Sequence, residues 1–154
     1  MGSIDLSTHP GHLFRRVQQV HTMLWAAAVS DDVTPPQFAV LNGLADEGGL
    51  DQRTLAERIA LDRSTAADVI TRLVRRGLVE RARDSADARR NVLRLTEPGR
   101  TAHTGLVRRT ERMIEILLTP LDGAEREQLL GLLGRVAQAG ERIRDPGSEV
   151  ASET

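Results

Sequence analysis

The chain has 154 residues, with 21 basic residues against 22 acidic ones and no cysteine. This length suits one domain with a sizeable core, and the absence of cysteine excludes disulfides, thiolate nucleophiles and thiol redox switches. No apolar run approaches the roughly 18 residues of a membrane span, and no basic segment precedes an apolar stretch at the N-terminus, so we expect a cytoplasmic protein without a signal peptide.

Two helices are expected before residue 50. Apolar residues recur at helical spacing between His9 and about Ser30. The second helix has strong start signals, because Thr34 suits the N-cap, Pro35 suits the first helical position and Gln37 completes a capping box. The pair Gly48–Gly49 is expected to end this helix.

The next segment is typical of a helix-turn-helix. A third helix is expected to start near Asp51, and residues 60–62 form a turn. Asp62 or Ser64 caps a fourth helix that runs to about Arg76. Two short helices joined by a tight turn place the second helix where it can enter the DNA major groove.

A β-hairpin is expected to follow, since Gly77 ends the fourth helix. Residues 78–81 and 92–95 have the composition of strands, and the polar stretch 84–90 is long for a hairpin turn. A long polar hairpin next to a helix-turn-helix is a wing. We therefore expect a mainly α fold with a small β-hairpin, the winged helix-turn-helix, flanked by N- and C-terminal helices.

The last third of the chain predicts two more helices. Thr96 can cap a fifth helix that ends near Leu118, and a capping box formed by Asp122 and Glu125 opens a sixth, to about Ile143. The flanking helices carry more apolar residues than a winged domain can cover. The alternatives are a single monomeric core and a dimer interface, and we favour the homodimer because two-fold symmetry sets two recognition helices in successive major grooves.

These elements define the expected organisation. Residues 1–154 form one domain, in which 31–98 are the DNA-binding lobe and 9–30 and 99–144 are dimerisation helices.

Positive charge is concentrated in the expected lobe. Residues 51–94 carry 11 arginines against 7 acidic residues, a net charge of +4, whereas the rest carries 10 arginines against 15 acidic residues, a net charge of −5. A near-neutral chain thus places its positive charge on the segment shaped to meet a polyanion.

The fourth helix has two different faces. Its apolar positions are Ala66, Val69, Ile70 and Leu73. Its opposite face presents Arg63, Thr65, Asp68, Arg72, Arg75 and Arg76. The arginines of this face are either DNA contacts or a solvated surface, and we favour DNA contact for Arg63, Arg72 and Arg75. Asp68 would restrain an arginine or accept from a cytosine amine.

Four motifs together resemble the MarR family of bacterial regulators. They are TPPQFAVL at 34–41, LAERIALDRSTAADVITRLVRRGLVER at 55–81, DARRNVLRLT at 87–96 and EPGR at 97–100. The resemblance covers roughly residues 10–143. It implies a homodimer that binds a pseudo-palindromic site on double-stranded DNA, a repressor, and release of the DNA when a small ligand, often a phenolic or aromatic acid, binds between the dimerisation helices and the winged lobe.

The resemblance also implies DNA-contacting residues. Ser64 and Thr65 match positions that touch bases, with Arg63 beside them, and Arg72 and Arg75 match contacts to bases or phosphates.

In the wing, Asp87 and Arg89 match a D-x-R pattern in which the aspartate steadies an arginine that enters the minor groove. Ala88 departs from the family, in which a second arginine is common there, so Arg90 is an alternative contact.

A ligand site is expected near the N-terminus. Segment 9–21, HPGHLFRRVQQVH, is similar to segments of relatives that sense hydroxycinnamates and benzoates, free or CoA-linked. An arginine there could pair a ligand carboxylate, and aromatic side chains could line the pocket or simply belong to the core. The candidate residues are Arg15, Arg16, His21, Trp25 and Phe38.

No catalytic or metal constellation is evident. The four histidines, His9, His12, His21 and His103, lack the spacing of a zinc site, and no serine has a base nearby. We therefore expect no enzyme and no cofactor. The leading hypothesis is a ligand-released DNA-binding repressor, and the alternatives are a regulator without an effector and a winged-helix module that binds proteins.

Overall fold

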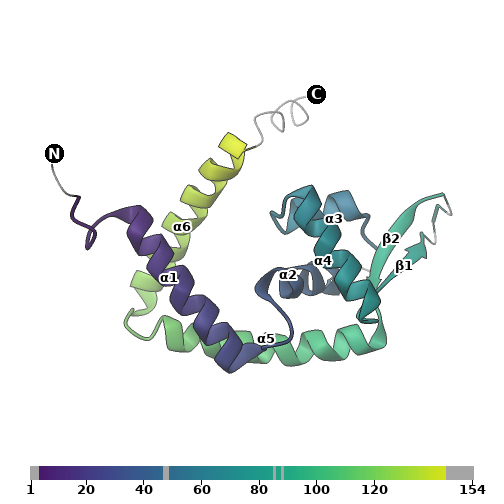
Figure 1. Cartoon of the computed structure of the whole chain (residues 1–154), viewed down its shortest axis with the longest axis horizontal. Helices are drawn as coiled ribbons and strands as arrows, with labels where there is room; N and C mark the ends of the chain where they lie inside the picture. Colours follow the sequence, from purple (N-terminus) through teal and green to yellow (C-terminus); the bar gives the residue numbers. More distant parts are fainter. Residues whose placement is uncertain (1–3, 47–48, 85, 88, 145–154) are drawn as a thin grey trace. The chain divides into compact units, whose positions relative to one another are not determined.

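The structure, a computed structural model, describes residues 4–46, 49–84, 86–87 and 89–144 (Figure 1). Helices dominate it, with one π-helical turn and one β-hairpin. In chain order the elements are α1 (Pro10–Leu24), η1 (Trp25–Val29), α2 (Pro35–Ala45), α3 (Gln52–Arg58), α4 (Arg63–Arg75), β1 (Val79–Arg83), β2 (Asn91–Leu95), α5 (Glu97–Leu117) and α6 (Gly123–Arg144). This confirms the expected mainly α fold with a small hairpin wing.

The chain divides into two units, Met1–Ile114 and Glu115–Thr154. The first holds α1 to β2 and most of α5, and the second holds the end of α5 and all of α6. In the described part of the chain, no helix is long and apolar enough to cross a bilayer.

Local capping explains where the helices begin. The Thr34 hydroxyl accepts from the Gln37 backbone at 3.4 Å, and the Gln37 side chain accepts from the Thr34 backbone at 3.0 Å. Asp122 and Glu125 form the second box, with two bonds of 2.9 Å. Both expected capping boxes are confirmed, and each satisfies two helical N–H groups that would otherwise lack partners.

Two helix ends differ from the expectation. The first helix does not continue regularly to Ser30, because α1 stops at Leu24 and a π-helical turn follows. The second ends at Ala45, before the glycine pair. Gly48 lies outside the described residues, and Gly49 has φ +102°, a conformation that glycine adopts at low cost.

The core of the first unit lies between α2, α3, α4 and the hairpin. Its side chains with at most 2% exposure include Val40, Leu41, Leu44, Leu55, Ala56, Ala66, Ile70, Leu73, Val79 and Leu93. Burial of each large aliphatic side chain stabilises the fold by about 1.5–3 kcal/mol before the loss of chain entropy. The core thus fixes α4 by its apolar face and leaves the opposite face outside.

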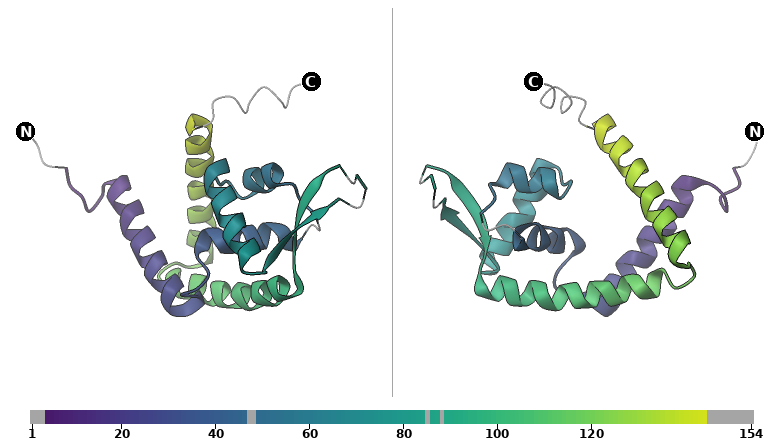
Figure 2. Two further views of the ribbon diagram at one scale, coloured as in Figure 1. Left: turned by 45° about the vertical axis from the view of Figure 1, so that its right-hand side comes forward. Right: turned by 180° about the vertical axis from the view of Figure 1, so that it is seen from behind.

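The hairpin is antiparallel, and its register pairs Val79 with Leu95 and Arg83 with Asn91. A third segment joins it, since the Leu93 amide donates to the Leu50 carbonyl at 2.7 Å. The backbone just before α3 is therefore tied to β2. Both views in Figure 2 show the hairpin projecting away from α2, α3 and α4.

Gly99 is a packing requirement of this lobe. It is buried near the start of α5, and a Cβ there would lie 2.0 Å from the Leu78 carbonyl oxygen. We expect Gly99→Ala to destabilise the protein by about 1–3 kcal/mol, as overpacking against backbone typically does. Chemical denaturation measures this value. The matched control is Gly105→Ala in the same helix, where the nearest atom is 3.9 Å away. That change should stabilise by up to about 1 kcal/mol through helix propensity, and equal effects of the two would contradict the packing argument.

Candidate nucleic-acid interface and effector site

Helix α4 is anchored at its start by Asp62. The Asp62 carboxylate accepts from the Thr65 backbone at 2.9 Å and from the Ser64 hydroxyl at 2.7 Å. Asp62 is therefore the N-cap, and Ser64 lies in the first turn. Ala66, Ile70 and Leu73 are buried.

The outer face of α4 is exposed and mostly cationic. The exposed residues there include Arg63, Ser64, Asp68, Arg72 and Arg75, while Thr65 is half-buried. Among the described residues, no ion pair is formed by Arg63, Arg72 or Arg75. Three guanidinium groups can thus reach a phosphate or a base edge without first breaking an ion pair.

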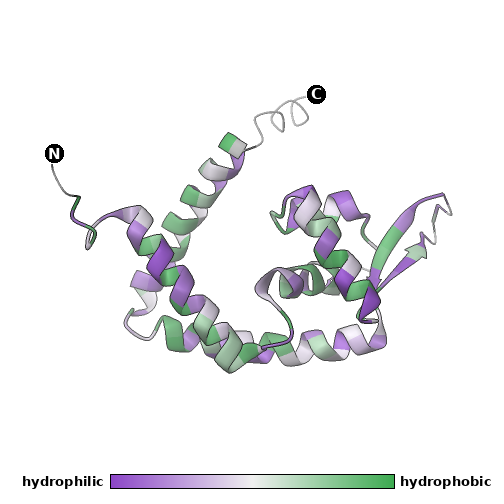
Figure 3. Cartoon of the chain, in the orientation of Figure 1, coloured by the Kyte–Doolittle hydropathy of each residue, from purple (hydrophilic) through white to green (hydrophobic). Residues whose placement is uncertain are grey.

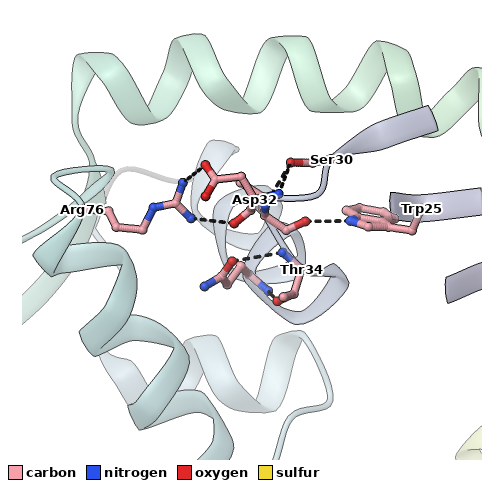
Figure 4. A network of polar contacts seen from close by, with 7 residues as sticks. Trp25, Ser30, Asp32, Thr34 and Arg76 are labelled. Atoms are coloured by element: carbon pink, nitrogen blue, oxygen red, sulfur yellow. Dashed lines mark hydrogen bonds and ion pairs between the residues drawn. The ribbon is translucent and has the colours of Figure 1, made fainter. Parts of the chain in front are cut away.

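Arg76, which the helical pattern placed on the same face, is held differently. Its guanidinium donates to the Asp32 carbonyl at 2.9 Å and also bonds the Asp32 carboxylate (Figure 4). Asp32 lies in the short segment before α2, where the Ser30 hydroxyl accepts from the Asp32 and Val33 amides at 3.1 and 2.9 Å. The C-terminal end of α4 is therefore fastened to the segment that joins η1 and α2.

The same segment receives the Trp25 side chain. The indole N–H donates to the Val33 carbonyl at 2.6 Å, and the ring is only 5% exposed. A continuous series of polar contacts therefore runs from Trp25 through residues 30–33 to Arg76, as Figure 4 shows.

The wing presents Arg89 at its surface. The Arg89 backbone amide donates to the Asp87 carboxylate at 3.0 Å, and both residues are exposed. The carboxylate therefore steadies the main chain of Arg89. Within the described residues it forms no ion pair with the Arg89 guanidinium. Ala88 lies outside the described residues.

Arg90 is paired rather than free. Its Nη2 lies 2.6 Å from Oδ2 of Asp51, the N-cap of α3. The pKa of Asp51 lies far below its ordinary value, first because the Thr54 amide donates to it, then because of Arg90 and the Thr54 hydroxyl. On the first strand, Arg81 likewise bonds the Gln52 side chain with two contacts of 3.3 Å.

The expected ligand residues fall into two groups. Arg15 and Arg16 are exposed on α1, and within the described residues the hydrogen bonds of the Arg15 guanidinium go to its own helix, to Gln19 at 3.1 Å and to His12 at 3.1 Å. His21 is half-buried and its Nδ1 atom is buried without a partner in the described structure. A buried polar atom without a partner costs free energy, so it favours a bound group that would satisfy it.

The aromatic side chains form one series of ring contacts. His21 and Trp25 have centroids 6.0 Å apart, Trp25 and Phe38 are 5.5 Å apart, and Phe38 stacks on His103 of α5 at 6.1 Å. His103 also bonds Asn42 at 3.0 Å, and burial lowers its pKa. The series links three of the expected residues and adds His103, which the sequence raised only as a metal ligand.

Thr110 was also missed by the sequence. Its hydroxyl is buried without a partner in the described structure, and it lies seven residues after His103, on the same face of α5. A threonine in a long amphipathic helix gives no local signal, because its burial depends on which helix packs against it.

Among the described residues, no three histidine or acidic side chains are grouped as a metal site.

Both units also expose apolar side chains. On α1 they are Leu13, Phe14, Val17, Val20 and Met23. On α6 they are Leu130, Leu132, Leu133, Val136 and Ile143. Figure 3 shows hydrophobic residues recurring along both of these helices. Exposed apolar residues in such number on one helix are typical of an interaction surface, so each unit carries a candidate surface of its own.

A buried three-helix core, a cationic exposed helix and an antiparallel wing define the class of winged helix-turn-helix proteins that bind DNA. A sequence model of the MarR family matches residues 31–90. The regulator HosA of Escherichia coli O111:H- is 33% identical over 128 residues, which cover 83% of this chain and 94% of HosA. The chain therefore belongs to the MarR family and is a DNA-binding transcriptional regulator.

Other similar proteins are transcriptional regulators as well. The repressor NicR of Pseudomonas putida is 30% identical over 138 residues, 89% of this chain and 87% of NicR. The Streptomyces coelicolor regulator PcaV, solved with its natural ligand, is 51% identical with a TM-score of 0.85, covering 91% of this chain and 99% of PcaV. Bordetella bronchiseptica BpsR, whose DNA binding is regulated by 6-hydroxynicotinic acid, is 31% identical with a TM-score of 0.80, covering 88% and 98%.

Proposed function

We propose that the protein is a homodimeric repressor that binds a pseudo-palindromic operator and is released by a small aromatic or phenolic carboxylic acid or its CoA thioester. The single observation that carries the DNA half is the exposed face of α4, where three arginines have no ion-pair partner in the described structure. The proposed DNA contacts are Arg63, Ser64, Thr65, Arg72, Arg75 and Arg89, and Asp87 is proposed to steady Arg89 at this interface. Phosphate contacts supply affinity, and base contacts supply sequence preference.

The homodimer is supported by the exposed apolar residues of α1 and α6. We assign 31–98 to DNA binding and 9–30 with 99–144 to dimerisation. Two-fold symmetry would place the two α4 helices about 34 Å apart, the spacing of successive major grooves on one face of B-DNA.

The effector half is supported by the Nδ1 atom of His21, which has no partner among the described residues and lies beside the Trp25 ring. We propose that a ligand ring packs near Trp25 and Phe38 and that its carboxylate pairs with an α1 arginine. The proposed residues are Arg15, Arg16, His21, Trp25 and Phe38. Regulation of BpsR by 6-hydroxynicotinic acid, an aromatic acid, supports this class of ligand, and the structure of PcaV with its natural ligand supports an effector site in the family.

Release follows from a population shift. A ligand that binds the DNA-incompetent form more tightly changes the spacing of the two α4 helices and lowers DNA affinity. A coupling of about 1–3 kcal/mol, or roughly 5- to 150-fold, is typical.

Fluorescence anisotropy on DNA from upstream of the protein's own gene tests both halves, with and without a panel of aromatic acids and their CoA thioesters. We expect tight binding that one compound weakens by about 5- to 150-fold. Binding that no compound disturbs would contradict the effector half and leave a regulator without an effector. Weak, sequence-independent binding would contradict the operator and favour a module that binds proteins.

A further inference from the structure

The start of α3 is joined to the hairpin by three separate contacts. Leu50 forms a backbone bridge with Leu93 of β2, and Gln52 bonds Arg81 of β1. Between these two residues, Asp51 reaches Arg90. Three consecutive residues therefore hold the hairpin, and the Asp51 contact is made to the residue just before β2, where the wing loop ends and the strand begins.

Arg90 is fixed through its main chain as well. Its carbonyl accepts from the Asp84 amide at 2.9 Å, and its own amide donates to the Asp87 carbonyl at 2.9 Å. These bonds close the base of the wing loop. The position of Arg90 therefore sets the position of Arg89, its neighbour in the loop.

Asp51 is unusual for a residue beside a DNA-binding surface. An ionised carboxylate there opposes a phosphate backbone by simple Coulomb repulsion. Its two oxygens are occupied, because Oδ1 accepts from the Thr54 amide at 2.9 Å and Oδ2 lies between the Thr54 hydroxyl and Arg90. These contacts hold the Asp51 carboxylate in place, so that it cannot rotate away from a bound phosphate without breaking them.

We propose that Asp51 and Arg90 are positioning residues for DNA binding, which hold the base of the wing so that Arg89 is presented to the minor groove. Arg90 then makes no phosphate contact of its own, and Asp51 aids DNA binding although its charge opposes it. The proposal rests on the wing contact with DNA proposed above.

The alternative role for Arg90 is direct contact with a DNA phosphate. One substitution distinguishes the two roles, because they predict opposite changes in DNA affinity. Asp51→Asn keeps the cap of α3, since asparagine caps helices as well as aspartate does, but removes the charge that pairs with Arg90. If Arg90 contacts phosphate, losing its competing carboxylate strengthens DNA binding. If Arg90 positions the wing, the same change weakens it.

The experiment measures DNA affinity by anisotropy on a duplex selected by the wild-type protein, between about 50 and 200 mM salt. We expect Asp51→Asn and Arg90→Gln each to weaken binding by about 3- to 10-fold, the scale of an ion pair lost in both protomers. The double variant should be no weaker than either single variant, because both remove one interaction. Arg90→Lys should recover part of the loss, and the slope of affinity against salt should stay at the wild-type value.

The matched control is Glu80→Gln, which removes from β1 an exposed acid that forms no ion pair in the described structure, and it should strengthen binding by about 2-fold through reduced repulsion. Tighter binding by Asp51→Asn, or a salt slope shallower by about 1 for each lost contact in Arg90→Gln, would overturn the proposal and make Arg90 a phosphate contact. Arg89→Ala is included in the series. If it leaves affinity unchanged, the wing does not touch DNA, and it is the proposed function that fails.

Discussion

Arg89→Ala is expected to weaken operator binding by about 10- to 100-fold and to make the salt dependence shallower. Arg89 is exposed, and its backbone is held by Asp87, so the side chain is presented while its guanidinium stays available. A homodimer carries the substitution twice, once for each wing. A cation in the narrow minor groove contributes both through shape preference and through counterion release. Anisotropy titrations across salt measure both effects.

The control for this prediction is Arg83→Ala. Arg83 is also an exposed arginine of the hairpin, at the end of β1, and it changes net charge by the same amount. We expect its affinity to stay within about 3-fold of the wild-type value, because loosely placed charges act only through screened attraction. Equal losses of DNA affinity for both variants would mean that the wing acts only through its overall positive charge. No loss for either variant would mean that the wing does not contact DNA.

The parts of the fold that the sequence predicted best depend on contacts within one helical turn. Thr34 with Gln37, and Asp122 with Glu125, are three residues apart, so residue types alone determine that their side chains reach the neighbouring N–H groups. The two faces of α4 follow from its periodicity in the same way. Local chemistry was sufficient there because no other element had to be placed first.

The contacts that the sequence did not predict join distant residues. Arg90 meets Asp51 across 39 positions, and Arg76 meets Asp32 across 44. The pattern could place both arginines at the surface, but not say which acid each one faces, because that depends on how α3, the hairpin and the segment before α2 are packed. The bridge from Leu50 to β2 was missed for the same reason.

The sequence predicted the candidate effector site only in part. It indicated the residue types, two arginines and two aromatic residues, but it could not distinguish aromatic residues that line a pocket from aromatic residues of the core. The structure buries Trp25 between His21 and Phe38 and leaves the Nδ1 atom of His21 without a partner in the described residues. A buried ring beside an unsatisfied polar atom favours a site that is completed by a ligand.

The geometry of α1 also ranks its two arginines. At about 100° per residue, Arg15 lies roughly 100° from the direction shared by His21 and Trp25, whereas Arg16 lies roughly 160° from it. In the part of the chain that the structure describes, Arg15 bonds His12 and Gln19 of its own helix, and a ligand can replace these contacts at the surface. A flexible arginine side chain can therefore turn from Gln19 towards a carboxylate near His21.

Arg15→Ala is accordingly expected to raise the effector concentration needed for half-release of DNA by about 10- to 100-fold, the scale of a lost charge-assisted bidentate contact. Operator affinity without effector should remain within about 2-fold, because Arg15 lies outside the residues proposed to touch DNA. Effector titrations against the preformed protein–DNA complex measure the first quantity, and anisotropy without effector measures the second.

Arg16→Ala is the matched control, since it removes the same charge from the next position of the same helix. A shift of less than about 3-fold is expected from screened attraction alone. A large shift for Arg16 with none for Arg15 would reverse the ranking and would require α1 to turn on binding. Equal and small shifts for both would mean that the carboxylate is bound elsewhere. The buried hydroxyl of Thr110 on α5, which has no partner within the described structure, would then be the next group to change.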